Sequence, residues 1–422
     1  MPDGRHTRAS LPTMHSVFWK ALAALLFLYV LIQQFGDGHW SHHVQREFLG
    51  HHYQEPLGRK NKTSRPSSTG DRVYKWERDR DNHALSAEQC DAAFPRLYRD
   101  INRAVGHWKN RTSSNETIEL YDGNEAGLRV LFKEQQLRIV ETKGMFREDF
   151  RQRIMVVLHQ LHRAIIAAEA TGQPLADTEF TVAIDDWPNF PRDGRELATL
   201  SFTRHPGRNA HKGVWLIPNF NFWSAPPVAD SFQEMQARAR KYDAPIAKKE
   251  QKLVWRRVDW TNHNIRGALL NVTEGKSWAD VRKMEWGHGD GVLHLDEFCQ
   301  YAYVANIEGR AWSSRLTHLL NCDSVPVLHD LKWMAHYYHL LKPDVNYIPV
   351  HRNFSDLLEK MEYYIEHPDI AQGIADSART MFRERYTTPA ATACYWRRLL
   401  RSWSSVAFKP EVARGIAFEE FL

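Results

Sequence analysis

The segment EGRAWSSRLTHLL, residues 308–320, gathers side chains that can bind an anion. It follows the apolar run YAYVANI at 301–307, which we expect to be a strand that the glycine ends. A helix starting there would point backbone N–H groups at an anion, and Arg315 could hold two phosphate oxygens at once. A capped helix with solvated arginines explains the pattern equally well. The residues of the predicted cradle are Gly309, Arg310, Ala311, Trp312, Ser313, Ser314 and Arg315.

A second group of arginines follows another predicted strand, LVWRRV at 253–258. Arg256 and Arg257 close this strand, and Arg266 lies near the start of the helix expected after it. Surface ion pairing is the ordinary role of such residues and is favoured when the segment is considered alone. Together with Arg315 they would form a diphosphate site, because a departing diphosphate must be neutralised in transfer from a nucleotide sugar.

Asp185 and Asp186 form the best candidate for a general base. They follow FTVAI at 180–184, a predicted buried strand, and ligands of α/β domains gather at the carboxyl ends of strands. Asp186 could take the proton of an acceptor hydroxyl as its oxygen attacks. The alternatives are a pair of aspartates that caps a loop, and a DxD-like metal site, for which adjacent carboxylates are a weak signal. His288 and Asp290 of GHGDG are further candidate ligands, although a glycine-rich surface loop explains them.

Helical and strand patterns alternate from about residue 150 to residue 404. The pattern at 150–170 predicts a helix whose apolar face consists of Ile154, Val157, Leu158, Leu161, Ile165 and Ala168. Further strands are predicted at 198–202, 213–218 and 324–329, and further helices at 311–320, 330–341, 354–366, 369–385 and 390–404. This order is typical of α/β proteins, and we expect two α/β halves with a cleft between them.

The composition is that of a globular protein with room for two domains. The 422 residues are 43% hydrophobic and 25% charged, and the net charge is only +5. No basic run is interleaved with aromatic residues, so nucleic-acid binding is not expected. Four cysteines suggest two disulfides with three possible pairings, and no CxxC or HExxH spacing indicates a metal site.

The N-terminal region predicts an entry into the secretory pathway. Residues 17–35 read VFWKALAALLFLYVLIQQF, with Arg5, Arg8 and Lys20 placed to keep the N-terminus cytoplasmic. We expect an uncleaved signal anchor, and a cleaved signal peptide is the alternative. The following residues are polar and read as a stem. Sequons for N-glycosylation, which fit a luminal chain, occur at Asn61, Asn110, Asn115, Asn271 and Asn353.

From about residue 178 to 400 the chain resembles glycosyltransferase family 90, which includes Rumi-type protein O-glucosyltransferases and fungal capsule-associated xylosyltransferases. The resemblance rests on an ordered series of segments rather than on any single one. These segments are FTVAIDDWPNFP, ATLSFTR, PNFNFW, LVWRRVDWTNHNIRGALL, DEFCQYAYVANIEGRAWSSRLTHLLNCDSVPVLH, VNYIPVHRNFSDLLEKM and ACYWRRLL.

The resemblance implies a GT-B fold, with two Rossmann-like domains facing across a cleft, and inverting, metal-independent transfer from a UDP-sugar. It implies that Asp186 is the catalytic base, that Arg266 and Arg315 hold the diphosphate, and that residues 309–314 surround the nucleotide. It also implies the disulfides Cys299–Cys322 and Cys90–Cys394.

This chain departs from the family pattern on two points beside these residues. Arg257 stands where the family usually has glycine, and Asp185 stands where a basic residue or glycine is common.

The combined prediction is an α/β glycosyltransferase of GT-B type behind a single N-terminal transmembrane helix. Its predicted parts are a cytoplasmic tail (1–16), an anchor (17–35), a stem (36–85), an acceptor-side domain with the base (86–225), a nucleotide-sugar domain (226–390), and a C-terminal helix and tail packing back on the first domain (391–422).

The predicted enzyme is a type II protein of the Golgi or endoplasmic reticulum membrane, with its catalytic part in the lumen. It would transfer xylose or glucose from UDP-xylose or UDP-glucose to a glycan, a polysaccharide or a protein, without a cofactor. Asp186 is the expected catalytic residue, and the expected donor-binding residues are Arg256, Arg266 and Gly309 to Arg315. A non-catalytic luminal sugar-binding protein with the same fold is the alternative.

Overall fold

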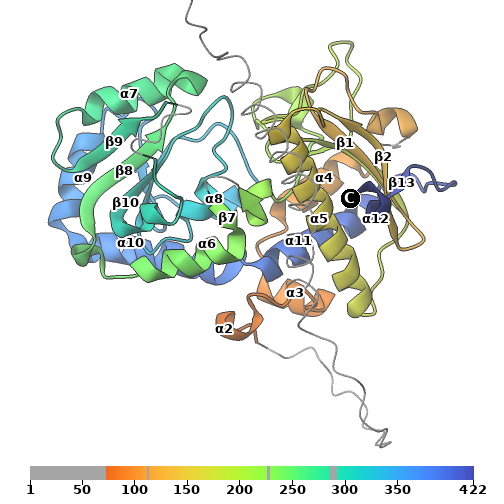
Figure 1. Ribbon diagram of the computed structural model, residues 1–422, viewed down its shortest axis with the longest axis horizontal. Helices are drawn as coiled ribbons and strands as arrows, with labels where there is room; N and C mark the ends of the chain where they lie inside the picture. Colours follow the sequence, from red (N-terminus) through yellow and green to blue (C-terminus); the bar gives the residue numbers. More distant parts are fainter. Residues whose placement is uncertain (1–72, 112–113, 226–228, 286–291) are drawn as a thin grey trace, which may run out of the picture. The chain divides into compact units, whose positions relative to one another are not determined.

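The computed structural model describes residues 73–422 except 112–113, 226–228 and 286–291 (Figure 1). The described residues belong to one compact unit, so the predicted domain boundaries stay predictions. The predicted tail and anchor, most of the stem, and the candidate ligands His288 and Asp290 lie outside the described residues.

The first sheet has six strands in the order β13-β2-β1-β3-β4-β5. Its strands are β1 (Gly127–Lys133), β2 (Gln136–Lys143), β3 (Thr178–Ala183), β4 (Thr199–Ser201), β5 (Trp215–Leu216) and β13 (Ile416–Ala417). Strands β3, β4 and β5 run parallel, whereas β1 pairs antiparallel with both β2 and β3. A tight turn at Glu134 and Gln135, both with positive φ, joins β1 to β2.

Long helices cover the first sheet and carry much of its core. α5 (Glu148–Ala170) packs against α11 (Pro389–Ser404), and α11 also contacts β3 and α4 (Arg99–Trp108). All six predicted core residues of α5 are buried, and Gly172, just beyond the end of the helix, has a positive φ. Three side chains of α11 bond to this half, because Tyr395, Trp396 and Trp403 donate to Leu216 O, Gln160 Oε1 and Glu179 O.

The second sheet has five parallel strands in the order β12-β11-β10-β8-β9. They are β8 (Glu250–Arg257), β9 (Ala279–Lys283), β10 (Tyr301–Asn306), β11 (Val325–His329) and β12 (Ile348–Val350). β10 and β11 are buried along their whole length, as expected for a parallel sheet with both faces covered. The longer helices that contact this sheet, seen around it in Figure 1, are α7 (His263–Thr273), α9 (Leu357–Glu366) and α10 (Pro368–Met381).

The shorter elements connect or border these two sheets. They are α2 (Trp76–Asp79), α3 (Ala87–Ala93), α6 (Phe232–Ala239), α8 (Leu316–Leu319), α12 (Phe418–Phe421) and the two-stranded ribbon of β6 (Ser224–Ala225) and β7 (Ala229–Ser231). The disulfides Cys90–Cys394 and Cys299–Cys322 are both present, which confirms the pairing that the family resemblance implies.

The predicted fold needs two corrections. The first half is not Rossmann-like, because the antiparallel β1–β2 hairpin and β13 extend its parallel strands into a mixed sheet. The prediction of a transmembrane helix is also not supported, since no helix in the described part of the chain is long and apolar enough to cross a membrane. The segment 17–35 itself lies outside that part. The fold we describe is therefore mixed α/β with two sheets.

Two predicted helices are also wrong. The expected helix at 311–320 is a loop followed by the single turn of α8, and its Trp312 packs against Phe202 and Phe220 of the other half. Residues 330–341 form an irregular segment instead of a helix, because the Glu308 carboxylate accepts from the backbone N–H groups of Lys332 and Trp333. Tertiary contacts override the helical pattern in both segments.

Candidate active site

The strand order of the second sheet marks one place for a ligand. Counted along the chain, the order is the second, first, third, fourth and fifth strand, so it reverses between β8 and β10. Doubly wound sheets bind ligands beyond the carboxyl ends of the strands at this switch point. In this protein those ends are Arg257 and Asn306. The predicted donor-binding residues 309–315 lie in the loop after β10, and Arg266 lies on α7, the helix that follows β8.

Gly309, in the loop after β10, packs closely against Arg266 of α7. A β-carbon at this position would lie 2.9 Å from Arg266 Nη2. Two hydrogen bonds hold this loop to the segment after β8, one of 2.8 Å from Asn262 Nδ2 to Gly309 O and one of 3.2 Å from Arg266 Nε, on α7, to Glu308 O. The structure thus places two of the predicted donor-binding residues, Gly309 and Arg266, in contact.

Arg315 is the most unusual residue of the site. Its side chain is buried, and Nη1 donates to Arg256 O at 2.8 Å. Among the described residues, Nε and Nη2 have no hydrogen-bond partner. Burial lowers the pKa of Arg315 well below its usual range, and the charges of Arg257 and Arg266 act in the same direction. A buried cation with two free donors and only like charges nearby lacks an anionic partner.

Arg266 and Arg256 differ in what they hold. Arg266 donates from Nη1 to Val258 O at 2.6 Å, and burial lowers its pKa to about 10. Arg256 forms a buried ion pair with Asp280 on β9, so its positive charge is already neutralised by the protein itself. The predicted donor-binding role of Arg256 thus has no free charge to support it.

The remaining residues of the predicted cradle are dispersed. Arg310 is exposed and lies over the ring of Trp260. Ala311 and Trp312 are buried in packing, and the carbonyls of Ser313 and Ser314 accept from Tyr338 and Asn221. A helix as short as α8 supplies no useful dipole, so an anion here would be bound by guanidinium groups.

The two aspartates after β3 have different surroundings. Asp185 is buried and accepts from the backbone N–H groups of Glu125 and Ala126 at 2.8 and 3.1 Å. Asp186 is 45% exposed and pairs with Arg153 at 3.1 Å. Its carboxylate also raises the pKa of Arg257 and Arg266 against the effect of burial, so it lies near the arginine cluster. Asp185 therefore anchors the loop, and Asp186 is the carboxylate open to a substrate.

The buried position of Asp185 predicts a pH effect on stability. Burial raises its pKa from 3.8 to about 6, so the folded protein binds this proton more tightly than the unfolded chain does. Wild-type stability should therefore fall as the pH rises from about 4 to 6. Asp185→Asn cannot ionise, and we expect it to gain up to about 3 kcal/mol relative to wild type across this window. Urea unfolding of both proteins at pH 4 and pH 7 measures the difference, and a difference independent of pH would contradict the expectation.

Sequence reasoning missed a buried network that shapes the site. Glu308, at 1% exposure, pairs with Arg352 at 2.7 Å, and its backbone N–H donates to His329 at 3.0 Å. This network ties the loop after β10 to the end of β11. Glu308 directly precedes Gly309. An acidic residue next to a loop glycine was therefore the feature of the sequence that could have indicated this network.

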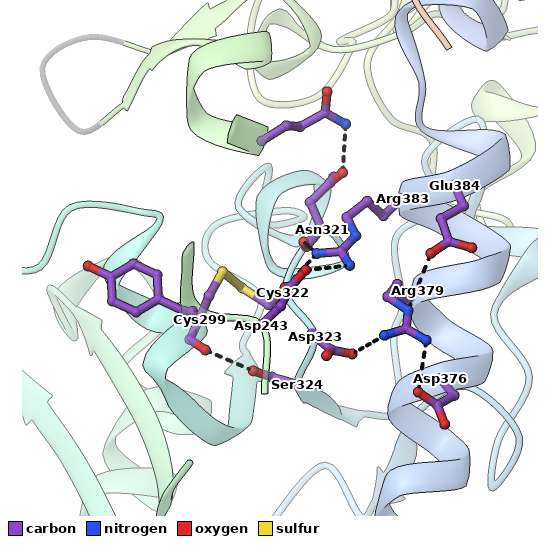
Figure 2. Close-up of polar contacts among 12 residues, drawn as sticks. Asp243, Cys299, Asn321, Cys322, Asp323, Ser324, Asp376, Arg379, Arg383 and Glu384 are labelled. Carbon is purple, nitrogen blue, oxygen red and sulfur yellow. Dashed lines mark hydrogen bonds and ion pairs between the residues drawn. A yellow bond between two sulfur atoms is a disulfide. The ribbon is translucent and has the colours of Figure 1, made fainter. Parts of the chain in front are cut away.

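The Cys299–Cys322 disulfide closes the loop that contains β10 and the whole predicted cradle (Figure 2). Beside it, Arg383 holds Asp243 at 2.8 Å and Asn321 O at 3.3 Å, and Arg379 holds Asp323 at 3.1 Å. Figure 2 shows these arginines and the disulfide gathered at the closing end of the loop. The loop is thus fixed at its base, which limits the movement of Arg315.

Removing this disulfide should weaken both the fold and the site. With a sequence separation of 23, loop-closure entropy predicts that Cys299→Ala/Cys322→Ala loses about 3 kcal/mol of unfolding free energy. UDP affinity should fall too, since the loop bearing Arg315 is released. The control Cys90→Ala/Cys394→Ala should lose stability and keep its UDP affinity. Urea unfolding and calorimetry measure both quantities, and equal UDP affinities for the two double variants would contradict the clamp.

Comparison with known proteins places this chain in a family. The chain is 26% identical over 271 residues to an O-glucosyltransferase rumi homolog of Aedes aegypti, with 58% of this chain and 65% of the relative covered. It is 33% identical over 265 residues to protein O-glucosyltransferase 2 of Danio rerio, with 58% and 51% covered. The chain therefore spans about half to two thirds of the length of these curated relatives.

One solved structure, a glycosyltransferase from Rickettsia africae ESF-5, aligns with a TM-score of 0.31 at 10% identity. The alignment covers 58% of this chain and 74% of the other, and a likeness this weak supports no conclusion. The family model is decisive instead. The model of glycosyl transferase family 90 matches residues 86–418, well over half of the chain, and this confirms the resemblance seen in the sequence. The chain belongs to glycosyl transferase family 90.

Proposed function

We propose that this protein is an inverting glycosyltransferase that moves glucose or xylose from a UDP-sugar to a hydroxyl group. The observation that carries the proposal is Arg315, a buried arginine with two donors left without a partner among the described residues. Such an arrangement is costly unless an anion completes it. A diphosphate fits because its oxygens accept paired N–H donors from arginine.

The roles follow from the surroundings of each residue. Arg315 and Arg266 bind the diphosphate at the switch point of the second sheet. Asp186 removes the proton of the acceptor hydroxyl, and its ion pair with Arg153 orients the carboxylate. The arginines supply the positive charge that a divalent metal gives to other glycosyltransferases, so we propose that no metal is needed.

The names of the relatives guide the choice of donor and acceptor. They are described as O-glucosyltransferases, in part as protein O-glucosyltransferases, which makes glucose and a protein hydroxyl the first pair to test. Xylose as donor sugar, and a glycan or polysaccharide as acceptor, remain within the proposal. The two disulfides support work in an oxidising compartment, and we propose the endoplasmic reticulum or the Golgi.

A panel of UDP-sugars tests the proposal. The full chain is incubated with each donor and with small disulfide-bonded protein domains as acceptors, with and without EDTA, and UDP release is measured. We expect release from UDP-glucose or UDP-xylose that EDTA does not reduce, and a product of inverted anomeric configuration. UDP binding without release from any donor would instead favour a non-catalytic sugar-binding protein, and inhibition by EDTA reversed by manganese would refute metal independence.

A further inference from the structure

Three arginines meet at three consecutive residues of the switch point. Arg315 donates to the carbonyl of residue 256, and Arg266 donates to the carbonyl of residue 258. Arg257, the last residue of β8, lies between these two carbonyls. Direct hydrogen bonds thus hold the guanidinium groups of Arg315 and Arg266 against the two residues that flank Arg257 in the chain.

The side chain of Arg257 makes no polar contact that would stabilise the described part of the fold. It is half-buried, and among the described residues it forms no hydrogen bond or ion pair through its guanidinium group. Its neighbour Arg256 is neutralised by Asp280, whereas the carboxylate that acts on Arg257 is that of Asp186. Arg257 therefore lies near both the candidate base and the two arginines assigned to the diphosphate.

We propose that Arg257 is a further catalytic residue, which stabilises the negative charge that UDP gains as it leaves the sugar. This inference rests on the proposed function. As the acceptor oxygen loses its proton to Asp186 and bonds to the anomeric carbon, the bond from that carbon to the β-phosphate oxygen breaks. Both electrons of the broken bond go to UDP, so the diphosphate passes from two negative charges to three.

The charge count matches this change. Arg315 and Arg266 balance the two charges of the bound donor, and Arg257 supplies the positive charge for the third. A contact that strengthens only as the bond breaks lowers the activation barrier without tightening donor binding. Arg257 should therefore act on turnover and on product binding more than on donor binding.

Calorimetry of the full chain with UDP and with a UDP-sugar tests this distinction. The UDP-sugar is whichever of UDP-glucose and UDP-xylose binds wild type more tightly, and the pH is 8, where UDP carries its full charge. Arg257→Ala should weaken UDP binding about tenfold and donor binding less than about threefold, and lower kcat by about a hundredfold. Arg257→Lys should recover part of both losses because it restores the charge.

The control Arg282→Ala removes the same charge from an exposed position on the neighbouring strand β9, where Arg282 pairs with Asp280. It should change neither ligand's affinity by more than about twofold. Equal losses of UDP and donor affinity in Arg257→Ala, or no loss of either, would overturn the inference. Failure of wild type to bind UDP would overturn the proposed function itself, so the two failures are distinguishable.

Discussion

The Asp186→Asn variant is expected to lose transfer activity by about 10²–10⁴-fold while binding UDP as tightly as wild type. Asparagine has nearly the same shape, but it cannot accept the proton of the acceptor hydroxyl. Asp186 pairs with Arg153 and makes no hydrogen bond to Arg266 or Arg315 among the described contacts, so the diphosphate site should persist. UDP release under donor saturation measures the first quantity, and calorimetry measures the second.

Asp185→Asn is the matched control, because it makes the same change one residue earlier. Asp185 is buried against the backbone of Glu125 and Ala126 and does not face a substrate. We expect this variant to shift stability with pH, as described above, and to keep turnover within about tenfold of wild type. Full activity of Asp186→Asn, or an equal loss in both variants, would contradict the assignment of Asp186 as the base.

Arg315→Met is expected to have opposite effects on stability and on binding. In the free protein Arg315 is a buried charge with two unpartnered donors, and replacing it with an apolar side chain of similar length removes that cost. The melting temperature without ligand should therefore rise. UDP affinity should fall by about a hundredfold, or about 3 kcal/mol, because a charge-assisted contact to the diphosphate is lost.

Arg397→Met is a control that separates burial from binding. Arg397 is also buried and also has an unpartnered Nε, but its Nη2 donates to Leu85 O in the first half of the protein. Its replacement should lower the melting temperature and leave UDP affinity unchanged. Thermal melts with and without saturating UDP measure both effects. A ligand-induced shift of Arg315→Met equal to that of wild type would refute the diphosphate role of Arg315.

Local patterns were sufficient for the elements that carry the site. The helix around Ile154 to Ala168 and the strands that end at Arg257 and Asn306 have periodicities that tertiary contacts reinforce. The β1–β2 hairpin could not be found this way, because its turn places Glu134 and Gln135 at positive φ without the usual glycine or asparagine.

The chemistry of the site was only partly accessible from the sequence. The sequence grouped Arg266, Gly309 and Arg315. In the structure Arg266 packs against Gly309, and Arg315 and Arg266 donate to the carbonyls of residues 256 and 258. The sequence could not show that Arg256 is neutralised, because its partner Asp280 comes from a strand 24 residues later in the chain. The sequence pattern also predicted that the N-terminus of a helix would bind the anion. In the structure the positive charge at this place comes from arginine side chains instead.

The central claim is that the arginine cluster at the switch point binds a diphosphate. Calorimetric titration of the full wild-type chain with UDP and with uridine tests it most directly, since the two ligands differ only in the diphosphate. The account predicts that UDP binds at least about a hundredfold more tightly and that its affinity falls as salt is added. Equal affinities for UDP and uridine, or no binding of UDP, would contradict it.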